Sequence, residues 1–216
     1  MQIKCAFITR RHALLPEIVI ALLLTGLGLT VTCGWLLHVP AMIEIRAGLV
    51  PMVFNTGLCF FLSGCAILLM KSSAPRARLA RQRRRASLLL LCGATFIELL
   101  FDRSLGIDLA ALHSWHDYGN TRPGRMAPNT ALGFMLIGAI IMLADRVVSR
   151  RRALIVVLLN AALLTIGLTG LVGYLLAPDL LYGWARSARM ALHTATGMIL
   201  STISLWLTWS KSDWYM

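Results

Sequence analysis

The chain has 216 residues, of which 58% are hydrophobic and 14% are charged, and its formal net charge is +12. So apolar a composition excludes an ordinary soluble domain and indicates several membrane spans. In a soluble protein the positive charge would suggest binding to nucleic acid, but beside membrane spans it sets their orientation instead. We therefore expect membrane lipids as partners and no nucleic acid.

Six apolar runs are long enough to cross roughly 30 Å of hydrocarbon as helices, which takes about 20 residues each. These runs are 16–37, 53–70, 86–102, 128–145, 153–176 and 190–209. The first run extends past the apolar core of a typical signal peptide and contains no good cleavage site, so we expect it to be retained. The predicted fold class is an all-α membrane protein with six transmembrane helices in a single domain, residues 1–216.

Basic residues are distributed unevenly between the runs. Fifteen Lys and Arg lie before the first run, in alternate connections or after the last run, and many of them fall in segment 71–85. The other connections hold six: Arg46, Arg103, Arg122, Arg125, Arg186 and Arg189. The positive-inside rule then predicts that both termini face the cytoplasm. We interpret segment 71–85 as a connection that binds anionic lipid headgroups, with docking of a specific partner as the alternative.

A short motif, Met-x-x-(Asn or His)-Thr-(Gly or Ala), occurs three times, each time where an apolar run begins. The copies are residues 52–57, 126–131 and 190–195. The runs before these copies end in similar phrases: Gly34-Trp35-Leu36-Leu37, Ile97-Glu98-Leu99-Leu100 and Gly173-Tyr174-Leu175-Leu176. A repeat of this length usually means that one supersecondary unit is used several times. The sequence therefore predicts three repeated helical hairpins, 16–70, 86–145 and 153–209.

The middle unit has a longer outer connection than the other two. Trp35 precedes the first motif copy by 17 residues and Tyr174 precedes the third by 16, but Glu98 precedes the second by 28. About a dozen inserted residues account for the difference. They contain the densest polar and aromatic cluster of the chain: His113, Trp115, His116, Asp117 and Tyr118. A loop that grows in one unit of a repeat often lies on the binding face.

The phrase Gly34-Trp35-Leu36-Leu37, with Leu105-Gly106-Ile107-Asp108 and residues 123–131 and 189–195, resembles a known family. It is similar to the six-helix integral-membrane input domain at the N-terminus of many bacterial sensor histidine kinases and diguanylate cyclases. The resemblance covers about residues 16–209 and implies signal input in the bacterial inner membrane. Such domains precede a cytoplasmic output module, so we expect either a fragment of a longer signalling protein or a free-standing sensor domain.

Asn55, Asn129 and His193 occupy the same place in the three motif copies, so we expect them at equal depth near the outer face. If the hairpins pack around a pseudo-threefold axis, these side chains could border one ligand site. The residues that would complete it are Thr130, Thr194, Glu98, Arg125 and Arg189. The alternative is that Asn and Thr at a helix start cap free backbone N–H groups, which would also recur in every repeat. The histidine slightly favours function because it is a poorer cap and can titrate.

His113, His116 and Asp117 could hold a transition metal, since imidazole and carboxylate suit zinc or copper, but three ligands in one loop are a weak signal. Haem on His193 would need a partner or open site on an opposing helix, and no other run has a histidine in its apolar core. The cofactor is therefore left unknown.

No catalytic triad, phosphate-binding glycine loop or paired carboxylates within a run is recognisable, so we expect no enzyme activity in this chain. A small transporter is the alternative function, because Glu98 and Asn160 are polar groups in apolar runs. A membrane scaffold or accessory subunit is another. Parallel repeats with polar positions at one face favour signal input over the inverted repeats of a typical transporter. We expect ligand occupancy to shift the helices of a homodimer and to reach the output module through the last run.

Overall fold

The computed structural model of the chain describes seven stretches, which contain helices and no strand. The described residues are 15–46, 49–70, 75–101, 103–116, 122–144, 149–176 and 190–210. Two residues of the predicted sites, Asp117 and Arg189, lie outside them. The all-α class predicted from the sequence is confirmed for the described part of the chain.

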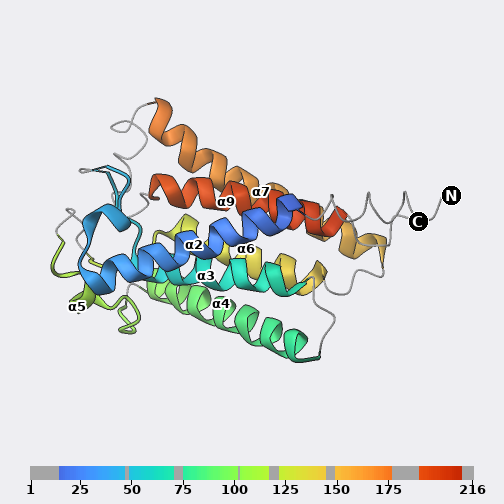
Figure 1. The fold of residues 1–216 in the computed structure, drawn as a ribbon, viewed down its shortest axis with the longest axis horizontal. Coiled ribbons are helices and arrows are strands. Elements are labelled where there is room, and N and C mark those ends of the chain that lie inside the picture. The colour runs from blue at the N-terminus through green and yellow to red at the C-terminus, as the bar shows by residue number, and fades with distance from the viewer. Residues whose placement is uncertain are drawn as a thin grey trace.

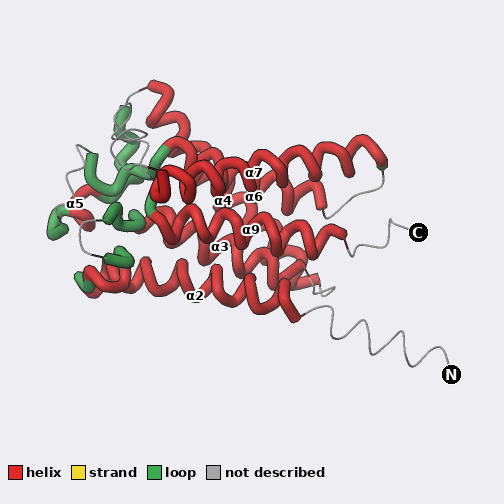
Figure 2. Tube along the Cα trace, turned by 90° about the horizontal axis from the view of Figure 1, so that it is seen from above, coloured by secondary structure: helices red, strands yellow, loops and turns green. Residues whose placement is uncertain are grey.

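Each of the six apolar runs coincides with one long helix. These helices are α2 (Leu15–Leu37), α3 (Phe54–Met70), α4 (Pro75–Phe101), α6 (Pro128–Ala144), α7 (Arg150–Leu176) and α9 (Leu192–Ser210). They lie side by side along one axis (Figure 1). Two short helices, the 3-10 helix η1 (Pro40–Met42) and α5 (Ala110–His113), lie in the connections at one end. We call this the loop end, where α2 finishes and where α3, α6 and α9 begin (Figure 2).

Helix α4 begins eleven residues earlier than predicted, at Pro75 instead of residue 86. Most of the basic segment 71–85 is therefore helical from Pro75 onward and continuous with the apolar run, and its place between two spans stays a prediction. The physical reason is local. Proline suits the first helical position, and the arginines, alanines and leucine that follow are strong helix formers. The charge pattern identified the residue at which the apolar run begins. The helix α4 begins earlier, at Pro75.

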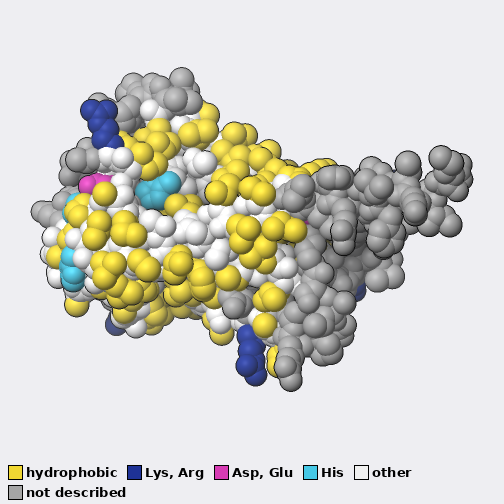
Figure 3. Space-filling model, viewed as in Figure 1, with side chains coloured by type: hydrophobic (Ala, Val, Ile, Leu, Met, Phe, Trp, Pro, Cys, Tyr) yellow, Lys and Arg dark blue, Asp and Glu magenta, His cyan; other side chains and the backbone are white. Residues whose placement is uncertain are grey.

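Two described helices are long and apolar enough to cross a membrane by length and composition, Pro16–Leu37 of α2 and Arg150–Tyr174 of α7. The helices Phe54–Met70 and Pro128–Ala144 and the apolar part of α4, Leu89–Glu98, are shorter. Large apolar side chains also cover much of the outer surface (Figure 3). Leu90 and Leu158, for example, are 73% and 67% exposed. Both features are weakly consistent with a membrane protein, and six spans remain a prediction.

The long helices pack as three pairs, α2 with α3, α4 with α6 and α7 with α9. Contacts of α3 with α4, α6 with α7 and α2 with α9 join the pairs into a closed ring. Within the ring, α3, α6 and α9 also contact one another. The three helices that open with the motif therefore form the centre of the bundle, and α2, α4 and α7 surround them.

The centre of the bundle follows the repeat. Phe60, Phe134 and Met198 each stand five residues after the Asn or His of their motif copy, and all three are fully buried. The Phe60 and Phe134 rings meet edge to face with centroids 4.8 Å apart. Phe60 lies against Gly197, and Met198 lies against Gly133. A large side chain from one inner helix thus packs on a small residue of a neighbour, which lets the three backbones approach closely.

Candidate functional site

The three motif copies occupy equivalent places at the loop end. Asn55, Asn129 and His193 are each the second residue of their helix. The methionines that open the copies, Met52, Met126 and Met190, are each 1% exposed, and the three threonines are buried too. The sequence alignment of the three units therefore corresponds to equivalent positions in the structure.

The helices α2, α4 and α7, which surround the centre of the bundle, end in similar sequences. Hydrogen bonds made by these end residues explain the similarity. Trp35 of α2 donates a hydrogen bond from Nε1 to the carbonyl oxygen of Met52, at 2.8 Å. Tyr174 of α7 makes the equivalent bond from its hydroxyl to the carbonyl oxygen of Met190, also at 2.8 Å. In the middle unit the aligned residue is Glu98, which cannot donate when ionised. Its Oε1 instead accepts a hydrogen bond from the backbone N–H of Leu105, in the connection between α4 and α6, whose described residues 103–116 and 122–127 we call the inserted loop.

The inserted loop of the middle unit folds over the start of α3, which belongs to the first unit. The backbone N–H of Phe54, the first residue of α3, donates to Nε2 of His113 at 3.2 Å. The Asn55 side chain donates from Nδ2 to the carbonyl oxygen of Ile107 at 2.7 Å. His113 therefore supplies one of the acceptors that a helix start needs, from a loop 59 residues further along the chain.

Aromatic rings fill the space between this loop and α2. The Trp35 ring lies 4.1 Å from the His113 ring and 5.3 Å from the Trp115 ring, measured between centroids. Trp115 also contacts His38 at 5.0 Å and His116 at 5.2 Å. The described members of the cluster that suggested a binding loop, His113, Trp115 and His116, are thus packed against the first unit, whereas Tyr118 lies outside the described residues.

His113 is held in one neutral tautomer by its two neighbours. Because Nε2 accepts from Phe54, the ring proton lies on Nδ1, which donates to the carbonyl oxygen of Leu109 at 2.9 Å. Burial lowers the pKa of His113 below its ordinary value, and the backbone contact at Leu109 and the charge of Asp108 oppose this effect only in part. A protonated ring would lose the acceptor for Phe54, so protonation disfavours the folded loop.

We expect His113→Ala to lower the free energy of unfolding by about 1 to 2 kcal/mol through loss of this cap. The parent protein should also lose stability as pH falls below about 6.5, the ordinary pKa of histidine. Below that pH the unfolded chain binds a proton at His113 more readily than the folded protein does. Thermal unfolding in detergent at several pH values measures both effects. His38→Ala is the control and should keep the acid-side loss. An unchanged pH profile in His113→Ala would contradict the assignment.

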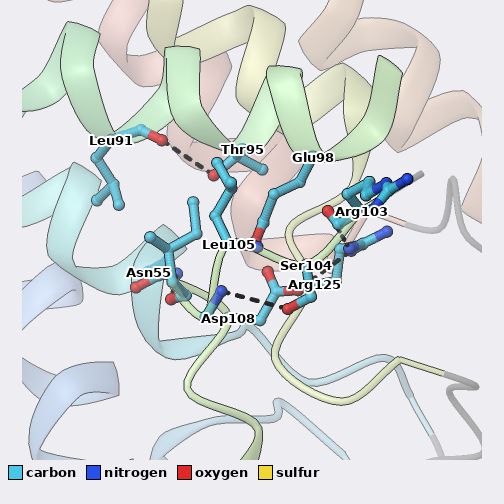
Figure 4. Close-up of polar contacts among 11 residues, drawn as sticks. Asn55, Leu91, Thr95, Glu98, Arg103, Ser104, Leu105, Asp108 and Arg125 are labelled. Carbon is cyan, nitrogen blue, oxygen red and sulfur yellow. Dashed lines mark hydrogen bonds and ion pairs between the residues drawn. The ribbon is translucent and has the colours of Figure 1, made fainter. Parts of the chain in front are cut away.

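A cluster of charged side chains joins the inserted loop to α4 and to the start of the second motif copy. Arg125 donates from Nε to Oδ2 of Asp108 at 3.1 Å and from Nη2 to the carbonyl oxygen of Arg103 at 3.3 Å. The Arg125 and Asp108 side chains are only 8% and 9% exposed. Glu98 reaches toward them from α4 (Figure 4) and interacts with the carboxyl group of Asp108 and the charge of Arg125.

A pocket of about 360 Å³ opens beside this cluster at the loop end. Its lining includes Ser104, Gly106, Asp108, Leu109, Arg122 and Arg125. Apolar side chains also line the pocket, from Leu109, Ala110 and Pro123, so it combines an apolar wall with the Asp108–Arg125 ion pair. It is a candidate for the ligand site that the sequence predicts at this end of the bundle.

The structure does not gather all the predicted site residues around one cavity. Glu98 and Arg125 come together, but Asn129 accepts from the backbone N–H of Thr130 at 2.9 Å, within its own helix. His193 faces the backbone of Ile43 in the first unit, and its ring nitrogens are buried without a hydrogen bond among the described residues. Thr130 and Thr194 are buried in the motif.

Sequence reasoning missed Asp108 as a site residue. Asp108 is the last residue of the sequence Leu105-Gly106-Ile107-Asp108, which contributed only to the family resemblance. An acid in the inserted loop, 17 residues before an otherwise unexplained Arg125, was the available signal.

The predicted metal ligands are not assembled into a metal site in the described part of the chain, where no group of three suitable side chains occurs. Both ring nitrogens of His113 are used in hydrogen bonds. His116 lies with Nε2 3.8 Å from a carboxylate oxygen of Glu44 instead. In this conformation His113 has no lone pair available for a metal.

Comparison of the chain with protein-family models, curated proteins and solved structures found no match. The fold and the site themselves define the class: a helical bundle with two candidate membrane helices and, at one end, a pocket beside a buried ion pair.

Proposed function

We propose that this chain is a signal-input domain of the bacterial inner membrane, with six spans and both termini in the cytoplasm. It senses a small ligand or a membrane or redox cue at the loop end, which faces outward. The last helix relays the change to a kinase or cyclase module, in the same chain or in a separate protein. Membrane lipids surround the bundle, and two copies pair as a homodimer.

Membrane insertion is supported by the surface of the bundle. The long helices run along one axis, and the beginning of α2 and the end of α9 lie at the end opposite the loops (Figure 1). Large apolar side chains such as Leu22, Leu100 and Leu158 are exposed on the bundle, where lipid would cover them. The fifteen-to-six asymmetry of basic residues supports the orientation.

The observation that carries the sensing role is the attachment of the inserted loop to helices of two different units. Leu105 of the loop bonds to Glu98 at the end of α4, and Ile107 bonds to Asn55 at the start of α3. The pocket lies in this same loop. A ligand that binds the pocket more tightly in one loop position would therefore shift α4 and α3 relative to each other, which is the differential affinity that signalling needs.

Transmission through α9 is supported by its place in the bundle. This helix contacts α2, α3, α6 and α7, so a change in their packing reaches it directly. Ser204 of α9 also donates to the carbonyl oxygen of Glu17 in the first turn of α2, at 3.4 Å. Movement at the loop end can thus reach the opposite end through one continuous helix.

The test uses the chain with a diguanylate cyclase attached after Met216, and its output is measured while external pH and the quinone pool are changed. We expect Glu98→Ala, Asn129→Ala and His193→Ala to alter the response while the protein still accumulates. Thr165→Ala, which alters an exposed local hydrogen bond on α7, is the control and should respond like the parent. Reduced melting temperatures with an unchanged response would show that these residues only stabilise the fold.

Reporter fusions test the orientation. A fusion after Trp115 should be active only with a reporter that works outside the cytoplasm, because the inserted loop is predicted to be external. A fusion after Ser210 should be active only with a cytoplasmic reporter. Cytoplasmic activity of the Trp115 fusion would overturn the proposed topology.

A small transporter is the second candidate, and Asn160 is the observation in its favour. This residue is buried in α7, its Nδ2 donates to the carbonyl oxygen of Val156 at 3.1 Å, and its Oδ1 has no described partner. Polar groups inside spans often mark transport pathways. Substrate uptake by liposomes that contain the purified chain, abolished by Asn160→Leu, would favour the transporter.

A further inference from the structure

Two buried carboxyl groups at the loop end each have one oxygen that lacks a hydrogen-bond donor. Glu98 is 0% exposed, and Asp108 is 7% exposed. Oε1 of Glu98 accepts from Leu105, and Oδ2 of Asp108 accepts from Arg125. Oε2 of Glu98 and Oδ1 of Asp108 are buried and have no partner among the described residues. Buried polar atoms are rarely left in this state.

The two carboxyl groups are also neighbours. The carboxyl groups of Glu98 and Asp108 point toward one another (Figure 4), and Asp108 and Arg125 both act electrostatically on Glu98. The helices packed against α4 add no further acid or base: α6 has no ionisable side chain, and α3 has only the thiols of Cys59 and Cys65. In the loop, Arg103 contributes its carbonyl oxygen to Arg125, and His113, which is held neutral, interacts with the charge of Asp108.

The charges in this cluster do not balance if both acids are ionised. One guanidinium then faces two carboxylates away from water, and one negative charge is left without compensation. An unpaired buried charge is costly, and two adjacent carboxylates commonly solve the problem by sharing one proton. Such a proton also gives the two orphan oxygens their missing hydrogen bond, since one becomes the donor and the other accepts.

We propose that Glu98 and Asp108 form a proton-binding site, in which one proton is shared between Oε2 of Glu98 and Oδ1 of Asp108 and Arg125 balances the remaining charge. Both oxygens are covered by protein, so a metal ion or an ammonium group has no access to them in this conformation. Asp108 also lines the outer pocket, which gives the proton a short path to solvent. The inference does not depend on the signal-input function.

Loss of the proton would change how the loop is held. Two negative charges would then be in contact, and their repulsion would push Asp108 and its loop away from α4. The bond from Leu105 to Glu98 joins the same two elements, so it would be weakened in the same movement. The site thus couples proton occupancy at the outer end to the attachment of the inserted loop.

Infrared spectroscopy of the purified full chain tests the proposal directly, because a protonated carboxyl group has a C=O stretching band that a carboxylate lacks. We expect such a band at neutral pH, with a component that disappears in Glu98→Gln and in Asp108→Asn. Glu44→Gln, which removes an acid elsewhere in the outer loops, is the matched control and should keep that component. An identical band in all four proteins, or no band in the parent, would overturn the proposal.

The pH dependence of thermal unfolding provides a second readout. The folded pair holds a proton that unfolded Glu and Asp release at about pH 4. Above about pH 6.5, where His113 is neutral in both the folded and the unfolded state, the melting temperature should therefore fall as pH rises until the folded pair releases its proton. Glu98→Gln places an amide donor where the protonated acid stood and should abolish the fall. If this variant does not fold, Asp108→Asn offers the same donor from the other side. A parent-like fall in the folded variant, or stabilisation of the parent by sodium or calcium instead, would refute the shared proton.

Discussion

Gly28→Ala should lower the free energy of unfolding by about 2 to 3 kcal/mol, which is the range of overpacking in a close helix contact. A Cβ atom on Gly28 of α2 would fall within 3.0 Å of backbone atoms of Gly57 and Phe61 on α3. Backbone atoms cannot turn aside as a side chain can, so the two helices would have to separate. Thermal or denaturant unfolding in detergent measures the loss.

The repeat supplies a graded comparison for this variant. Gly167 of α7 is the equivalent position in the third unit, where a Cβ would lie 2.8 Å from a side-chain carbon of Ile199 and 3.2 Å from the nearest backbone atoms. We expect Gly167→Ala to cost about 1 kcal/mol, because the side chain can move. Gly26→Ala is the control: its Cβ would meet nothing within 4 Å, and alanine favours the helix by roughly 1 kcal/mol. Equal effects at Gly26 and Gly28 would contradict the proposed packing.

Arg125→Met should be the most damaging change at the loop end, with a loss of about 3 to 5 kcal/mol. The variant leaves the buried acids Asp108 and Glu98 without their counter-charge and removes the donor to the carbonyl oxygen of Arg103. A buried charge that loses its partner costs more than the pair itself contributes. Melting temperature and the yield of folded protein report the loss.

Two further variants separate charge from simple truncation. Arg122→Met changes a second arginine of the same pocket, but that side chain is exposed, so we expect a loss below about 0.5 kcal/mol. Adding Asp108→Asn to Arg125→Met should recover part of the stability, since it removes the buried acid that has lost its ion-pair partner. A double variant that is less stable than Arg125→Met would mean that the ion pair is not the source of the effect.

The helices and their repetition could be predicted from the sequence because both are local properties. Apolar runs of sufficient length favour helices wherever they occur, and the recurrence of Met-x-x-(Asn or His)-Thr marks the start of α3, α6 and α9. The spacing from Trp35 to Met52 and from Tyr174 to Met190 identified pairs that are joined by equivalent hydrogen bonds. The starts of α4 and α7 lie eleven and three residues before the predicted runs, because hydropathy alone does not detect a polar helical extension.

The partners of the polar side chains depended on tertiary structure. Nothing local pairs His113 with the first N–H of α3, or Arg125 with Asp108, since each contact joins segments that the packing of three hairpins brings together. For the same reason Asn55 and Glu98, which the repeat suggested would share a site, bond to different points of one inserted loop. Composition and periodicity determined the helices and the order of the units. The packing of the helices decided which acids and bases became neighbours. Hydrogen bonds and ion pairs require short distances between atoms, and the spacing of residues along the sequence does not determine these distances.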